Sequence, residues 1–275
     1  RRLVANKFRD RRVFIAGDAS HLWVPYAGYG MNAGIADGLN LSWLLAARIQ
    51  GWGHESMLDA YEAERQPITE QVSQFAMNHA AKMIKARSSV PANIEADDAA
   101  GRQERERIGQ ECYEINVQQF CCAGLNFGYY YQHSPIIAED GEQPPAYTMG
   151  SFEESTAPGC RVPHFWLDAQ TSLYDELGQG YTLLRFDPLV RVDALLEQSH
   201  QRGMPIKLID IARSALQVPA AYRHKLLICR DDQHIAWRAD ELPDASVRPL
   251  LDRLTGRTTT SQAASAFAAA ELAPA

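Results

Sequence analysis

The sequence lacks the cysteine pattern of a disulfide-bonded or zinc-binding protein. Its five cysteines, spread over 275 residues, form no CxxC pair and no Cys/His cluster with metal-ligand spacing. They are Cys112, Cys121, Cys122, Cys160 and Cys229. An odd, scattered set in a chain of this length is typical of reduced thiols, so we expect a cytoplasmic protein without a metal site.

Long apolar runs and an excess of basic charge are also missing. No apolar run approaches the ~18 residues that a membrane-spanning helix needs, and no signal peptide is visible. The net charge of −7 leaves no basic stripe that could displace counterions from phosphates. We therefore expect no membrane and no nucleic acid among the partners. A hydrophobic content of 46% instead indicates a globular chain with one large or two ordinary domains.

The N-terminal third combines a short strand with long helices. Residues 12–16 form an apolar run that predicts a buried strand, and a glycine-spaced loop follows at 25–30. Apolar residues at helical spacing predict a helix over 32–50. A second helix is expected over 55–87, with a kink or a boundary near Pro67.

The middle of the chain is more polar. Residues 88–111 are charge-rich and indicate a solvated loop and helix face, and a more apolar helix is expected over 108–125. Prolines, glycines and acidic residues within 138–160 suggest a boundary between domains. The three tyrosines at 129–131 fit either a substrate pocket or ordinary core and interface packing.

The last hundred residues predict a small α/β module. The expected elements are a strand at 181–186, a helix at 190–201, a strand at 206–211, a hairpin formed by 224–229 and 234–238, and a helix at 247–254. The alanine-rich tail after Thr258 is expected to be frayed or disordered.

One stretch near the N-terminus carries chemistry. The strand at 12–16 delivers the carboxylate of Asp18 at its C-terminal end, and a loop with small residues then allows close approach of a ligand. The helix that follows, beginning near Met31 and Asn32, points free N–H groups and its positive dipole end at the same place. An anion, or a ring that becomes anionic, would suit this site. His21 is as readily a surface or core histidine as a base.

The combination of these pieces resembles the class A flavoprotein monooxygenases, the family of p-hydroxybenzoate and phenol hydroxylases. The stretches that carry the resemblance are Gly17-Asp18-Ala19-Ser20-His21, Pro25, Gly28 to Gly34, Asp37 to Trp43, and Leu58 to Pro67. The resemblance implies FAD as cofactor and NAD(P)H as co-substrate. It also implies hydroxylation of a phenolic or polyketide aromatic substrate with O₂ through a flavin C4a-hydroperoxide.

The resemblance also assigns a cofactor-binding set but no catalytic residue. The implied FAD contacts are Gly17, Asp18, Pro25, Gly28, Tyr29, Gly30, Met31 and Asn32. Asp18 would hydrogen-bond the ribityl chain, while Pro25 and the backbone of Gly28 to Asn32 would line the edge of the isoalloxazine. The N-terminus of the following helix would stabilise negative charge on the ring.

Four stretches of the C-terminal module carry a second resemblance: Gly159 to His164, Ser172 to Asp175, Gly178 to Leu184 and Ile235 to Arg238. They look like the thioredoxin-like domain of the phenol-hydroxylase branch, here without a CxxC pair. We thus expect an α/β fold, α+β in parts. Residues 1–140 would complete an FAD-binding domain, 141–158 would be a linker, 159–257 the thioredoxin-like domain and 258–275 the tail. The role of the thioredoxin-like domain would be structural or in subunit contacts, and a homodimer is one expected assembly.

The family's G-x-G-x-x-G turn for the FAD pyrophosphate is missing from this sequence. We therefore expect the chain to be the C-terminal half of a longer enzyme, whose partner is the N-terminal FAD-binding half. Alone it should bind FAD weakly or not at all and be inactive. Two alternatives stay open: a related flavoenzyme that performs epoxidation, Baeyer–Villiger oxidation or halogenation, and a non-catalytic interaction or assembly module.

Overall fold

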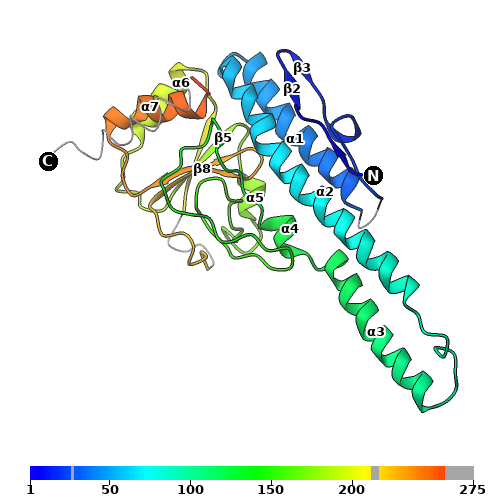
Figure 1. The fold of residues 1–275 in the computed structure, drawn as a ribbon. Coiled ribbons are helices and arrows are strands. Elements are labelled where there is room, and N and C mark those ends of the chain that lie inside the picture. The colour runs from blue at the N-terminus through cyan, green and yellow to red at the C-terminus, as the bar shows by residue number, and fades with distance from the viewer. Residues whose placement is uncertain (26–27, 212–216, 258–275) are drawn as a thin grey trace. The chain divides into compact units, whose positions relative to one another are not determined.

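The computed structural model describes residues 1–25, 28–211 and 217–257 (Figure 1). The elements of its first half are β1 (Leu3–Val4), β2 (Arg9–Asp10), β3 (Val13–Phe14), η1 (Gly17–Ala19), β4 (His21–Leu22), α1 (Tyr29–Ile49), η2 (Glu55–Leu58), α2 (Asp59–Ser88), α3 (Ala99–Phe120) and α4 (Ala123–Phe127). Those of its second half are α5 (Leu173–Glu176), β5 (Tyr181–Arg185), α6 (Asp193–Gln201), β6 (Ile206–Asp210), β7 (Leu226–Arg230), β8 (Ile235–Ala239) and α7 (Asp244–Leu254).

The chain divides into two compact units, which we describe separately. The first unit contains residues 1–37, 66–128 and 147–152, and the second contains 38–65, 129–146 and the chain from 153 onward. Helices α1 and α2 therefore each contribute residues to both units. The domain boundaries expected from the sequence stay a prediction.

The first unit begins with two small antiparallel ladders. Strand β1 pairs with β4, and β2 pairs with β3 in a tight hairpin whose turn contains Arg11 at φ 54°. The predicted strand over 12–16 is thus reduced to two residues, and Val13 is 66% exposed rather than buried. The prediction was wrong here because a two-residue hairpin strand has no second layer to cover it.

Helices make up the remainder of the first unit. Helix α1 begins at Tyr29, three residues earlier than predicted, and ends at Ile49 as expected from the glycines that follow. Pro67 lies inside α2 and is not a boundary. The predicted loop is present at residues 89–98, but α3 begins at Ala99, within the stretch expected as a loop and helix face, and runs as one helix to Phe120, followed by the short α4.

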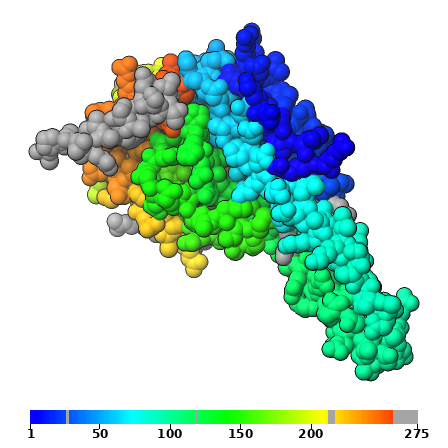
Figure 2. Space-filling model, in the orientation of Figure 1, coloured from blue at the N-terminus to red at the C-terminus, as the bar shows by residue number. Residues whose placement is uncertain are grey.

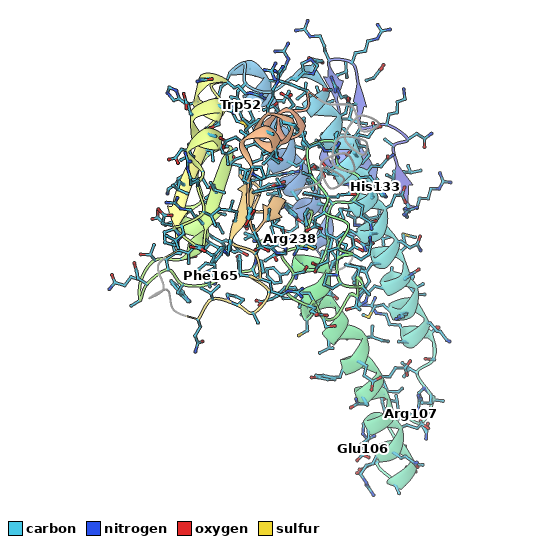
Figure 3. The ribbon with its side chains drawn as sticks, turned by 90° about the vertical axis from the view of Figure 1, so that its left-hand side faces the viewer. Trp52, Glu106, Arg107, His133, Phe165 and Arg238 are labelled. Atoms are coloured by element: carbon cyan, nitrogen blue, oxygen red, sulfur yellow. The ribbon has the colours of Figure 1, made fainter. Side chains whose placement is uncertain are left out.

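The early start of α3 has a local cause. The carboxylate of Asp98 caps the helix by accepting a hydrogen bond from the backbone N–H of Gly101 at 2.7 Å. Arg107 pairs with Glu104 at 2.8 Å, which supports a helix on this charged stretch. The side chains of Glu106 and Arg107 are exposed on the charged part of α3, and the expectation of a solvated face is confirmed (Figure 3).

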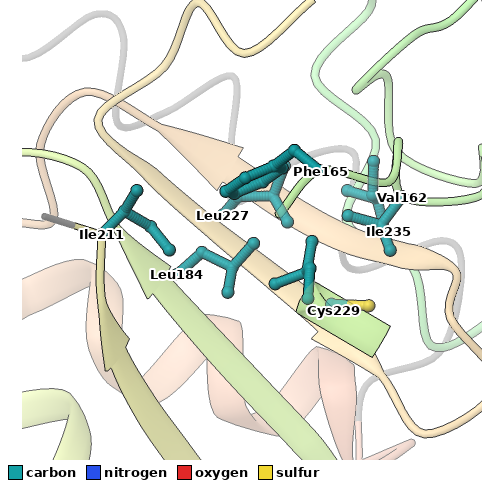
Figure 4. Close-up of a cluster of buried hydrophobic side chains, with 8 residues drawn as sticks. Val162, Phe165, Leu184, Ile211, Leu227, Cys229 and Ile235 are labelled. Carbon is teal, nitrogen blue, oxygen red and sulfur yellow. The ribbon is translucent and has the colours of Figure 1, made fainter. Parts of the chain in front are cut away.

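The second unit is built on a four-stranded sheet in the order β6-β5-β7-β8. Strand β5 runs parallel to β6 and antiparallel to β7, and β7 forms a hairpin with β8. This confirms the predicted strands, the hairpin and the α/β character of the module. One face of the sheet carries a cluster of buried apolar side chains, shown in Figure 4: Val162, Phe165, Leu173, Leu184, Ile211, Leu227, Cys229 and Ile235.

Helices α6 and α7 pack together beside this sheet, and α6 also contacts β6. The hydroxyl of Tyr181 on β5 donates to the carbonyl oxygen of Leu254 at the end of α7, 2.7 Å away. Trp43 of α1 and Trp52 pack edge-on against the same tyrosine ring. A buried aromatic cluster therefore joins the second half of α1 to the sheet within this unit.

Residues 139–158 form neither helix nor strand, and much of this segment, green in Figure 2, lies on the surface. Arg238 of β8, labelled in Figure 3, ties it to the sheet. Its guanidinium contacts Asp140 at 2.7 Å, Glu142 at 2.5 Å and the hydroxyl of Thr156 at 3.0 Å. Residues 139–158 are therefore coil, but the contacts with Arg238 anchor this coil to the sheet.

Candidate functional site

The turn after β3 presents the first predicted site residues. The chain is extended at Ala16 and then turns at Gly17, whose φ of 56° lies in the left-handed region that favours glycine. Gly17 opens the 3₁₀ turn η1, in which Asp18 has an exposed side chain. Ser20 closes the turn, because its backbone N–H and its hydroxyl both donate to the Gly17 carbonyl oxygen, at 2.8 and 2.9 Å. Asp18 is therefore held on a short, well-bonded turn.

The N-terminus of α1 presents the second group. Gly28 has a φ of 69° and its carbonyl oxygen accepts a hydrogen bond from the Asn32 side chain at 2.8 Å. A Cβ added at Gly28 or at Gly30 would meet no atom within 4 Å, so open space lies beside both backbones. None of the residues in the first turn of α1 is acidic, so no carboxylate of its own neutralises the dipole there.

These features pass a test of fit for a flavin. The pattern needs an exposed carboxylate for a polyhydroxyl chain, and Asp18 provides one. It also needs a glycine-bordered helix N-terminus for an electron-rich ring, which Gly28 and Gly30 border. Pro25, Met31 and Asn32 are exposed on the same loop and helix start.

Tyr29 differs from the other predicted site residues because its ring is buried. The ring packs edge-on against Phe75 at 5.8 Å, and its hydroxyl contacts the Cys122 sulfur and donates to the Gln119 carbonyl oxygen at 3.2 Å. Burial, and then the contact with Cys122, raise the pKa of Tyr29 above its ordinary value. The backbone of Tyr29 therefore belongs to the candidate flavin site, whereas its phenol packs inside the first unit.

Asp37 and His21 are the site feature that sequence reasoning missed. Both residues belong to the stretches that carry the family resemblance, but the sequence assigned neither of them a role in the flavin site. The Asp37 carboxylate, on the second turn after Asn32, accepts from the Gly17 N–H at 3.1 Å and lies 2.7 Å from His21 Nε2. The distances of 16 and 20 residues along the chain gave no local signal for this contact.

A cavity of about 710 Å³ lies elsewhere in the first unit. Its lining is Phe75, Asn78, His79, Ala81, Lys82, Cys122, Met149 and Gly150. Phe75 and Cys122 also contact Tyr29, the first at its ring and the second at its hydroxyl. The volume is within the range of small-molecule sites.

The second unit contains a different charged cluster, centred on Arg230 of β7. Its guanidinium is fully buried and forms two hydrogen bonds to Glu64, at 2.5 and 2.7 Å, and two to Asp232, at 2.6 and 3.1 Å. The side chain of Asn40 donates to Glu64 at 2.8 Å. Trp43 flanks the guanidinium at 4.9 Å. Asn40 and Glu64 carried part of the family resemblance, and here they serve a closed internal network.

Two of the tyrosines at 129–131, Tyr129 and Tyr131, belong to the surroundings of this network. Tyr131 is 4% exposed, stacks near His234 at 4.1 Å and lies 5.3 Å from the Arg230 guanidinium. Tyr129 packs on the same histidine at 5.4 Å. The sequence left open either a substrate pocket or ordinary packing for these tyrosines, and the contacts of Tyr129 and Tyr131 are packing contacts.

Within residues 1–25, 28–211 and 217–257, no group of His, Cys, Asp and Glu side chains could hold a metal ion. Over the same residues, no helix is both long and apolar enough to cross a membrane. The predicted tail after Thr258 lies outside the described residues.

Two family models match the chain. The model of an FAD binding domain matches residues 1–76, and the model of the C-terminal part of aromatic-ring hydroxylases matches residues 155–258. The first match contains the Asp18 turn and the start of α1, and the second contains the four-stranded sheet.

Individual proteins agree with these matches. FAD-dependent monooxygenase opdD of Penicillium oxalicum is 32% identical over 250 residues, which are 87% of this chain and 47% of that protein. Tetracenomycin B2 monooxygenase-dioxygenase of Streptomyces olivaceus is 30% identical over 93% of this chain and 45% of its own length. A solved structure of RebC, soaked with chromopyrrolic acid and containing 7-carboxy-K252c, superimposes with a TM-score of 0.83 and 31% identity, over 93% of this chain and 48% of its own. The chain thus spans less than half the length of each of these relatives.

Proposed function

Because the chain belongs to the family of FAD-dependent aromatic monooxygenases, we propose that it is the C-terminal half of such an enzyme and supplies one side of its flavin site. The observation that carries the proposal is the open N-terminus of α1, bordered by Gly28 and Gly30, together with the exposed carboxylate of Asp18 on the turn η1. Polar groups that a folded chain leaves open in this way are available to a ligand.

The residues of this site would each act on a different part of the cofactor. Asp18 accepts hydrogen bonds from the ribityl hydroxyls. The backbone from Gly28 to Asn32 lines the edge of the ring, and the dipole of α1 stabilises negative charge on it. When bound, FAD supplies the transfer of an oxygen atom from O₂ to the substrate, with NAD(P)H as the electron donor.

The substrate in this proposal is a phenolic or polyketide aromatic compound. One of the relatives above is named as a monooxygenase-dioxygenase of tetracenomycin B2, and the structure of RebC contains 7-carboxy-K252c. The cavity beside Phe75 and Met149 offers the chain an apolar wall of suitable size for part of such a ring system. Product analysis with the full-length protein separates hydroxylation from epoxidation, Baeyer–Villiger oxidation and halogenation.

An exposed apolar surface supports the proposal that a further half packs here. Leu3 and Leu22 are direct partners across the β1–β4 ladder, yet they are 59% and 47% exposed. Met31 and Ile35 are adjacent on one face of α1 and are 73% and 62% exposed. Exposed apolar side chains grouped on paired strands and on one helix face usually belong to an interface. We assign this one to the N-terminal, nucleotide-binding half.

A titration tests the proposed function. The full-length protein should bind FAD tightly and oxidise NAD(P)H in the presence of phenols. The 275-residue chain alone should bind FAD weakly or not at all and should be inactive, because the pyrophosphate-binding half is not part of it. A sub-micromolar dissociation constant for FAD with the isolated chain would contradict this. A homodimer stays a prediction, which light scattering of the full-length protein can check.

A further inference from the structure

The pair formed by His21 and Asp37 is buried too deeply to touch a ligand. His21 is 3% exposed and Asp37 is 0% exposed, and the His21 Nε2 lies 2.7 Å from the Asp37 carboxylate. The imidazole packs against the ring of Trp23, at 4.8 Å and nearly parallel, and the ring of Phe8 lies 6.4 Å away. Enclosed in this way, the pair can influence chemistry only through the residues that it holds.

The residues that it holds are the two ends of the Asp18 turn. The Asp37 carboxylate accepts the N–H of Gly17, which precedes Asp18, and its contact with His21 fixes the residue that follows Ser20. One turn earlier on α1, Gly34 packs against Gly17 so closely that a Cβ at Gly34 would lie 3.3 Å from the Gly17 Cα atom. Helix α1 therefore grips the turn by a hydrogen-bonded carboxylate and by a glycine contact.

The same helix also carries the other half of the candidate flavin site. Its N-terminal residues, from Tyr29 to Asn32, lie less than three turns before Asp37 on a continuous helix. A rigid helix that holds the Asp18 turn near one point and presents its N–H groups at its end sets the separation between the two flavin-contacting elements. A buried carboxylate costs free energy unless it is well bonded, and two of the contacts of Asp37 go to that turn.

We propose that Asp37 and His21 are positioning residues for the flavin: the buried pair fixes the turn from Gly17 to His21, so that the Asp18 carboxylate stands at a set distance from the N-terminus of α1. This inference rests on the proposed function, since it concerns the same FAD site. Neither residue is catalytic, because neither reaches the surface where the cofactor would bind.

The test compares ligands that report different parts of the cofactor. In the full-length apoprotein, D37N keeps the size of the side chain and one acceptor oxygen, but it removes the negative charge from the group that accepts from Gly17 and contacts His21. The dissociation constants of FAD and of riboflavin should then rise about tenfold, the effect of losing one charge-assisted hydrogen bond. The dissociation constant of ADP should stay the same, because ADP lacks the ring and the ribityl chain. Equal losses for all three ligands, or none, would overturn the proposal.

A double-mutant cycle asks whether the pair acts through Asp18. If it does, D37N should add less than twofold to the effect of D18A on riboflavin binding. Full additivity of the two effects would show that Asp37 acts on the ligand by another route. D232N is a matched control, since Asp232 is also a buried aspartate beside a histidine. It should lower the melting temperature and leave flavin binding within twofold.

A second pair of variants covers the case in which D37N does not fold. Gln at position 21 places an amide nitrogen near the position of Nε2, whereas Leu removes every polar atom there. H21Q should therefore bind riboflavin within about threefold of wild type, and H21L should bind it about tenfold more weakly. Equal affinities for H21Q and H21L would overturn the inference. If the wild-type protein binds no FAD at all, the proposed function itself fails, which is a different result.

Discussion

The Asp18 turn and the Arg230 cluster both contain charged side chains, but they differ in how those charges are used. At the turn, Asp18 is exposed and the adjacent N-terminus of α1 has no acidic residue of its own. In the cluster, Arg230 is fully buried and its hydrogen bonds go to Glu64 and Asp232. The first arrangement leaves a carboxylate and backbone N–H groups accessible to a ligand, while the second pairs its charged groups with one another inside the protein. A charged motif residue therefore identifies a site only when the fold leaves it accessible.

Removal of Arg230 should give the largest effect on stability. R230M leaves two buried carboxylates, Glu64 and Asp232, without their cation, so the free energy of unfolding should fall by about 3–5 kcal/mol. Urea denaturation measures this. If the Arg230 cluster and the Asp18 turn are independent, the folded fraction of R230M should bind FAD at the Asp18 turn as the wild-type protein does. A loss below about 1 kcal/mol would mean that the cluster is not a closed structural network.

The same cluster predicts a loss of stability in acid. Burial acts to raise the pKa of Asp232, but Arg230 and then His234 outweigh it and lower the pKa below its ordinary value. The stabilisation is thus fully present above the unfolded pKa of about 3.9 and is lost as the pH falls through the folded pKa. Urea denaturation between pH 5 and 2 should show a steeper decline for wild type than for D232N. Equal slopes would count against the ion pair.

At the open site, substitution should affect binding but not stability. D18A removes an exposed carboxylate, so the free energy of unfolding should stay within about 0.5 kcal/mol of wild type. The dissociation constant of FAD for the full-length protein should nevertheless rise about tenfold, measured by quenching of flavin fluorescence. A D18A protein that binds FAD normally would remove Asp18 from the site.

Gly30 offers a sharper version of the same comparison. It lies in α1 with open space around it, so G30A should leave stability unchanged or raise it by about 0.5 kcal/mol. The added methyl group would occupy the space in which the flavin edge approaches, so FAD affinity should fall. A thermal melt measures the change in stability, and a flavin titration on the same sample measures the change in FAD affinity. Unchanged affinity would show that the ring does not approach this backbone.

The smallest effect is expected on the surface of α3. Arg107 pairs with Glu104 and Glu111, but its side chain is about half exposed. R107M should therefore change the free energy of unfolding by at most about 0.5 kcal/mol. It serves as the reference for R230M, since both variants remove one arginine from a contact with two acids. Similar losses in the two variants would erase the difference between buried and exposed pairs.

The success of sequence reasoning depended on the range of the interactions involved. The strands at Tyr181–Arg185 and Leu226–Arg230 were predicted because short apolar runs and turn residues act over a few neighbours. The start of α3 was not predicted, although Asp98 and Gly101 give a local capping signal, because a charged composition fits a solvated loop as well as a helix face. The buried carboxylate of Asp37 had no such signal, since its partners are 16 and 20 residues away.

By itself, the sequence determined the family, the α/β character of the C-terminal module and the order of residues around Asp18, because these depend on short patterns. Tertiary structure alone decided which charged residues are open and which are enclosed. It buried Arg230 against Glu64, 166 residues away, and folded Asp37 back onto Gly17. Accessibility is a property of packing between distant segments, and no local pattern encodes it.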